Sequence, residues 1–155
     1  MPAPIPTPEI LLLLDGLDEA FDKKSWHGPN LRGAIRGITA QQASWRPATD
    51  AHNIWEYVMH AAYWKYVVRR RITGEKRGSF PMPGSNFFIR PVQLSEAAWK
   101  GDIDLLAAQH RDLRRAVTEL AALTRTLTHL IRGAAAHDLY HAGQIRLLRK
   151  LCPGM

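Results

Sequence analysis

Cysteine is nearly absent from this chain, because Cys152 is the only one among 155 residues. A disulfide within the chain is therefore impossible, and a zinc or iron–sulfur site built from cysteine ligands is excluded. Long apolar runs are also missing. The longest one near the start covers only residues 10–14, and no lysine or arginine precedes it. Such a run is too short to cross a bilayer and lacks the basic start of a signal peptide. We therefore expect a soluble, cytoplasmic protein.

Acidic residues are the minority among the charges, since 14 Asp and Glu face 21 Lys and Arg and leave a formal net charge of +7. A basic excess favours anionic partners, such as nucleic acid, a membrane surface or an acidic small molecule. The same excess is also typical of a solvated basic surface. No helix-turn-helix signature accompanies the charge. We therefore expect a small-molecule substrate and no nucleic-acid or membrane partner.

Strand-like alternation and hairpin turns do not stand out, whereas helical patterns do. Apolar residues recur at helical spacing in four long segments, 8–24, 51–73, 95–120 and 126–150. These patterns predict an all-α protein, a four-helix bundle formed by a single domain over residues 1–155. Four prolines among the first eight residues predict an extended arm at residues 1–7.

Capping residues and breakers suggest where the helices begin and end. Thr7, Asp50 and Ser95 are the expected N-caps of the first three long helices, and Asn30 is the expected cap of a short helical piece that ends at residue 36. Gly74 is the expected C-terminal glycine of the second long helix.

Two connections are expected to be irregular. Residues 39–47 are predicted to form a turn and a loop. Residues 75–94 hold three prolines and two glycines and predict a long loop, long enough to cross the bundle between the second and third long helices.

Two histidines four residues apart, His137 and His141, are the strongest chemical signal. On a helix such residues share one face, and their imidazoles can converge on a metal whose bonds to nitrogen are about 2.1 Å long. They lie on the apolar stripe of the last helix, where unligated and unbonded imidazoles would be costly. A structural role as hydrogen-bonded histidines is the alternative for this pair.

His60, in the middle of the second long helix and among apolar neighbours, is the best third ligand. Three imidazoles favour Zn, Ni, Fe or Cu over Mg or Ca, and they leave a coordination position open for water or substrate. A metal there could lower the pKa of bound water or of a bound thiol, and either product is a nucleophile.

Three polar residues accompany the histidines. Gln144, one turn further along the stripe, could bind metal-bound water or substrate, or tie helices together as a buried amide. Glu56, four residues before His60, could orient that imidazole, act as a general base, or form a salt bridge. Asp138 is one residue off the shared face, so we expect it to make a hydrogen bond from helix to loop.

These motifs resemble the DinB/YfiT-like family. The specific match is the last-helix segment 137–145 together with the segment 54–60 that ends in His60. Weaker support comes from residues 31–47 and from Trp99 near the start of the third long helix. The resemblance covers essentially the whole chain after the proline-rich arm.

The resemblance implies a four-helix bundle with a metal site formed by His60, His137 and His141, often holding Zn or Ni, and a homodimer. Some relatives are metal-dependent S-transferases that use bacillithiol, mycothiol or glutathione, and others are described as hydrolases.

Our first hypothesis is therefore a metal-dependent enzyme that transfers a low-molecular-weight thiol, as a metal-activated thiolate, to an electrophilic small molecule. The first alternative is a hydrolase that uses metal-bound hydroxide at the same site. The second is a basic nucleic-acid-binding or interaction module whose histidines are structural.

Overall fold

The computed structural model describes residues 5–155, and all regular secondary structure in that range is helical. The helices are α1 (Pro8–Phe21), α2 (Leu31–Ile35), α3 (Ala40–Ser44), α4 (Ile54–Thr73), α5 (Glu96–Thr118) and α6 (Arg125–Leu151). The predicted all-α class is confirmed. Residues 1–4 of the predicted proline-rich arm lie outside the described residues.

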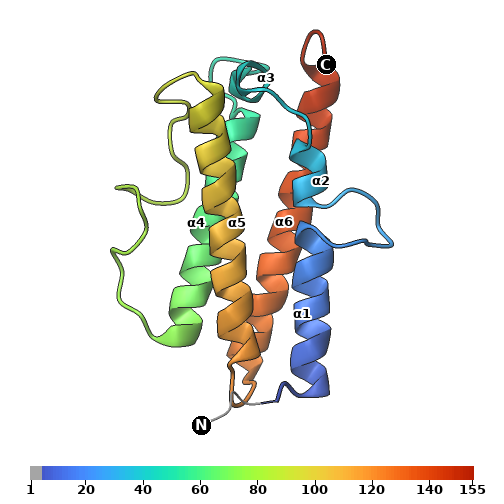
Figure 1. The fold of residues 1–155 in the computed structure, drawn as a ribbon, viewed down its shortest axis with the longest axis vertical. Helices are drawn as coiled ribbons and strands as arrows, with labels where there is room; N and C mark the ends of the chain where they lie inside the picture. The colour runs from blue at the N-terminus through green and yellow to red at the C-terminus, as the bar shows by residue number, and fades with distance from the viewer. Residues whose placement is uncertain (1–4) are drawn as a thin grey trace.

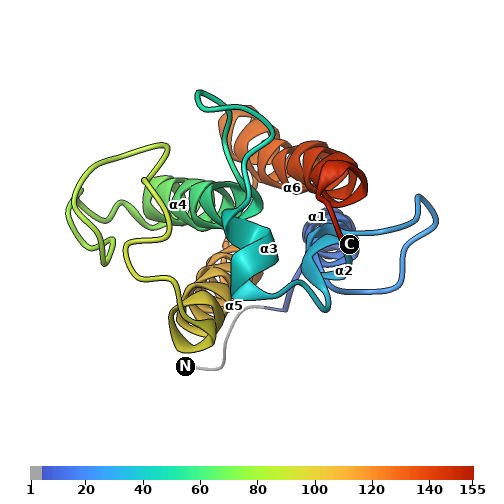
Figure 2. The same ribbon diagram turned by 90° about the horizontal axis from the view of Figure 1, so that it is seen from above.

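The four long helices α1, α4, α5 and α6 lie side by side (Figure 1). α4 contacts α5 and α6, and α1 contacts the same two helices, which closes a ring of four. α1 and α6 run in one direction, and α4 and α5 run in the other. α4 and α5 are parallel because the segment between them carries the chain back along the molecule before α5 begins. Seen from above, the short α3 lies across the end of this ring (Figure 2).

Side-chain caps mark the starts of the helices. The predicted caps Thr7, Asn30 and Ser95 each accept a backbone N–H from the first turn that follows. The prediction of turn and loop for residues 39–47 is wrong, because α3 forms there behind a capping box. In that box the Thr39 hydroxyl accepts from the Gln42 N–H, while the Gln42 side chain accepts from the Thr39 N–H. This reciprocal pair satisfies two backbone donors of a very short helix.

The start of α4 differs from the prediction, and Asp50 is not its cap. The cap is Asn53, whose Oδ1 accepts the backbone N–H three residues further on at 2.8 Å. Its Nδ2 donates to the carbonyl oxygens of Arg90 and Ser44, so the completely buried amide joins three segments of the chain. Contacts from distant segments therefore select Asn53 over Asp50. The predicted Gly74 does end α4, with φ of 73°.

Two apolar clusters fill the interior at different heights of the ring. One cluster contains Trp55, Met59, Leu106 and Ile145, and the other contains Ile10, Leu17, Leu113 and Ile131. Each long helix contributes to both clusters and carries a buried polar residue near the boundary between them. We refer to these four residues as the polar layer: Asp18 of α1, Lys65 of α4, His110 of α5 and Asp138 of α6.

One ion pair and the contacts of a neutral histidine connect the polar layer. Lys65 Nζ lies 2.5 Å from Asp138 Oδ2 and 3.4 Å from His110 Nδ1, and His110 Nε2 lies 3.4 Å from Asp18 Oδ1. Lys65 is only 2% exposed and Asp138 only 1%. The expected hydrogen bond from Asp138 to a loop is therefore wrong, because its carboxylate pairs with a lysine of the neighbouring helix.

Across residues 5–155, none of the helices combines the length and the apolar character that crossing a membrane requires.

Candidate metal centre

The three predicted histidines come together between α4 and α6. His60 lies near the middle of α4, and His137 and His141 lie one turn apart on α6. His137 Nε2 is 3.0 Å from His60 Nε2 and 3.0 Å from His141 Nε2. One ring nitrogen from each residue lies within 4.8 Å of the other two, so the group could hold a metal ion. We call these three residues the histidine cluster.

Hydrogen bonds fix the orientation of two rings in the cluster. The backbone carbonyl of Asn86 accepts a hydrogen bond from Nδ1 of His60 at 3.0 Å. The side-chain Oε1 of Gln144 accepts one from Nδ1 of His141 at 2.6 Å. Since oxygen acceptors require a proton on Nδ1, the lone pair of each ring is left on Nε2, the atom that faces the centre of the cluster. This tautomer is the one that a metal ligand needs.

Burial keeps these rings neutral. Burial, together with the charges that neighbouring histidines would carry, lowers the pKa of His60 to about 4 and that of His137 to about 3. The pKa of His141 is also lowered by burial, against the opposing effect of Gln144. At neutral pH all three rings are therefore uncharged, which is the form that binds a metal.

The nitrogen separations suit a bound transition metal. Three nitrogens that each lie about 2.1 Å from one ion are roughly 3.0–3.4 Å apart for bond angles between a right angle and a tetrahedral one. The Nε2 atom of His137 lies 3.0 Å from the Nε2 atoms of His60 and His141, at the lower end of this range. The donors are neutral imidazoles, which suit Zn, Ni, Fe and Cu. Residues and geometry therefore fit such an ion.

Gln144 is brought to the cluster, whereas Glu56 is not. Both oxygens of Glu56 accept hydrogen bonds from the Arg46 guanidinium, and the carboxylate also contacts His52 Nδ1 and the Arg90 backbone N–H. Burial alone would raise the pKa of Glu56, but these hydrogen bonds lower it to about 2. Glu56 therefore anchors the segment before α4 and the end of the long loop. It neither orients His60 nor serves as its base.

Sequence reasoning missed the contribution of the segment between α4 and α5. Besides its carbonyl bond to His60, Asn86 accepts a hydrogen bond from Trp64 Nε1 through its side chain. The ring of Phe87 stacks on His60, with centroids 3.9 Å apart, and also on His52. Asn86 has φ of 69°, in the left-handed region that Asn tolerates better than most residues. An asparagine inside a loop rich in proline and glycine was the only available signal, and nothing in its spacing pointed to His60.

The fold and the cluster define a helical protein with a three-histidine site between two of its long helices. The family model of the DinB superfamily matches residues 25–145, which is most of the chain. The chain therefore belongs to the DinB superfamily, and the predicted family is confirmed. No curated protein and no solved structure matches the chain.

Proposed function

We propose that this protein is a metal-dependent enzyme that transfers a low-molecular-weight thiol to an electrophilic small molecule, with His60, His137 and His141 as the metal ligands. The observation that carries the proposal is the convergence of three Nε2 atoms, two of them on rings whose Nδ1 is already engaged. Membership of the DinB superfamily supports a metal site, and the net charge of +7 suits an anionic thiol.

The chain's own residues prepare the site. Asn86 and Gln144 hold two imidazoles in the ligating tautomer, and burial keeps all three neutral at physiological pH. The stacked ring of Phe87 and the nearby Trp64 restrict the movement of His60 and cover one side of it. A Zn or Ni ion bound there would supply positive charge that favours ionisation of a thiol near neutral pH.

At the electrophilic carbon, the reaction forms one bond and breaks one. The thiol sulfur forms a bond to an electrophilic carbon of the second substrate, and the leaving group departs from that carbon with its electron pair. The thiol proton passes to solvent, so that thiol and electrophile give thioether, proton and leaving group. No oxidant or reductant is consumed.

Metal content tests the site directly. Protein purified without an affinity tag should carry close to one equivalent of Zn or Ni by elemental mass spectrometry, and His137→Ala should carry much less. His27→Ala, which removes an exposed loop histidine, is the matched control and should keep the metal. Equal and negligible metal in the wild type and in His137→Ala would refute the proposed centre.

A thiol panel tests the reaction. Glutathione, bacillithiol and mycothiol are each incubated with monochlorobimane and metal-loaded protein, and the fluorescent adduct is followed above the spontaneous rate. We expect one thiol to be preferred and the acceleration to disappear with His137→Ala. Turnover of esters or amides without any thiol, with no acceleration of adduct formation, would favour a hydrolase instead.

A further inference from the structure

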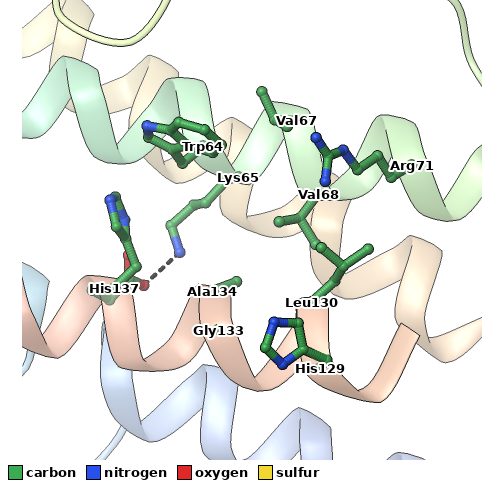
Figure 3. Close-up of a pocket in the computed structure, with 11 residues that line it drawn as sticks. Trp64, Lys65, Val67, Val68, Arg71, His129, Leu130, Gly133, Ala134 and His137 are labelled. Atoms are coloured by element: carbon green, nitrogen blue, oxygen red, sulfur yellow. Dashed lines mark hydrogen bonds and ion pairs between the residues drawn. The ribbon is translucent and has the colours of Figure 1, made fainter. Parts of the chain in front are cut away.

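A pocket with mostly apolar walls lies beside the histidine cluster, between α4 and α6 (Figure 3). Its volume is about 170 Å³. Six residues form the apolar walls: Trp64, Val67, Val68, Leu130, Gly133 and Ala134. For comparison, an apolar cavity of about 150 Å³ accepts a benzene ring. The pocket therefore has room for one ring or a short branched alkyl group.

One end of the pocket touches the proposed metal centre. His137 is the only member of the histidine cluster among the lining residues, and the buried pair of Lys65 and Asp138 lies beside it. A group held in the pocket would therefore sit against one ligand of the metal, without displacing the other two histidines.

The opposite end of the pocket is basic. Arg71 of α4 and His129 of α6 lie there, and both side chains are exposed. Within residues 5–155 Arg71 forms no ion pair. Because α4 rises about 1.5 Å per residue, Arg71 lies roughly 10 Å along the helix from Trp64 at the cluster end. The pocket thus joins a metal-proximal end and a free guanidinium across one ring-sized apolar space.

We propose that this pocket binds the electrophilic acceptor, and that the acceptor carries an apolar ring or short alkyl group with a carboxylate at the end remote from the reacting carbon. The assignment to the acceptor rests on the proposed function. Low-molecular-weight thiols such as glutathione are polar along their whole length and would not fill an apolar slot. A ring with a terminal carboxylate matches both the walls and Arg71, since guanidinium binds carboxylate through paired hydrogen bonds.

Binding of an unreactive probe to the full chain in EDTA tests the pocket without any metal. The probe is 4-phenylbutyrate, and 4-phenylbutan-1-ol is its uncharged analogue. Both are titrated into the protein and followed by the shifts of backbone amide resonances. We expect saturable binding of 4-phenylbutyrate with a Kd near or below about 1 mM, as for other ligands of this size.

A filling variant with a matched control locates the binding. A Cβ added at Gly133 meets nothing within 4 Å, so Gly133→Leu should fold and narrow the pocket. Gly101→Leu makes the same change at an exposed position of α5, where a Cβ also meets nothing within 4 Å. We expect Gly133→Leu to raise the Kd of 4-phenylbutyrate at least tenfold and Gly101→Leu to leave that Kd unchanged. Equal Kd values in the wild type and Gly133→Leu would overturn the proposal.

The basic end is tested separately with Arg71→Gln, an exposed substitution that leaves the core untouched. This substitution should weaken the binding of 4-phenylbutyrate several-fold and leave the binding of 4-phenylbutan-1-ol unchanged. An equal loss of affinity for both probes would refute the carboxylate assignment. Because these titrations use metal-free protein, a failure to bind the probe would refute the pocket proposal and would not affect the proposed metal centre. If metal analysis fails while the probe still binds, the proposed reaction falls and the pocket remains a binding site for aryl carboxylates.

Discussion

The polar layer offers a quantitative test of how the helices are held together. In Lys65→Met the long apolar stem of the side chain is kept and the ammonium group is lost. Asp138 is then left as a carboxylate that is 1% exposed and has lost a partner 2.5 Å away. Removing one member of a buried ion pair costs about 3–5 kcal/mol, mainly because the remaining charge is buried alone. We expect Lys65→Met to lower the free energy of unfolding by that amount.

Urea unfolding in EDTA, followed by circular dichroism at 222 nm, measures this loss without any contribution from bound metal. Lys100→Met is the control, since it makes the same change in a pair whose side chains are 76% and 61% exposed and should cost less than about 1 kcal/mol. The double variant Lys65→Met, Asp138→Leu removes both charges and should recover most of the stability. The reasoning is refuted if Lys65→Met costs no more than Lys100→Met, or if the double variant is as unstable as the single one.

Three further expectations concern the site and its surroundings. Gln144→Ala should weaken zinc affinity about 10- to 100-fold in competition with a chelating dye, because His141 loses the acceptor that fixes its tautomer; unchanged affinity would contradict this. Glu56→Gln should lower the urea midpoint while the metal content stays at the wild-type level, since Glu56 binds Arg46 and not the cluster; loss of metal would contradict the assignment. Burial and the charge of Lys65 lower the pKa of His110 to about 3, whereas the unfolded chain takes up that proton near pH 6.5. Metal-free protein should therefore lose stability as the pH falls below 6.5, by roughly 2 kcal/mol at pH 5 from this group alone. His110→Asn should reduce this loss of stability at low pH. A pH profile of stability identical to that of the wild type would contradict the role of His110.

Residues that act within one helix were predictable from the sequence. The four-residue spacing of His137 and His141 places them on one face by helical geometry alone, and the apolar neighbours of His60 indicate that its face is buried. The caps Thr7 and Ser95 follow from the same local rules, since a hydroxyl just before an apolar periodic segment accepts a backbone N–H of the first turn.

Residues whose partners lie far away in the sequence were not predictable. Glu56 is one turn from His60 along the helix, yet the guanidinium of Arg46, from the preceding loop, draws its carboxylate elsewhere. Lysines are seldom fully buried unless they are paired. Lys65 is buried because Asp138 of another helix compensates its charge. Nothing in either residue's neighbours reports these pairings, because they depend on how the helices are arranged.

The link between Asn86 and His60 limits which substitutions the loop can accept. The acceptor is a main-chain carbonyl, so the imidazole depends on the path of the chain at residue 86 and not on a particular functional group. That path has a positive φ, which glycine adopts freely and which a β-branched residue resists. A substitution elsewhere in the loop that keeps this path leaves the acceptor for His60 in place. The backbone conformation at residue 86, and not the chemistry of that side chain, therefore limits which residues can support the His60 imidazole.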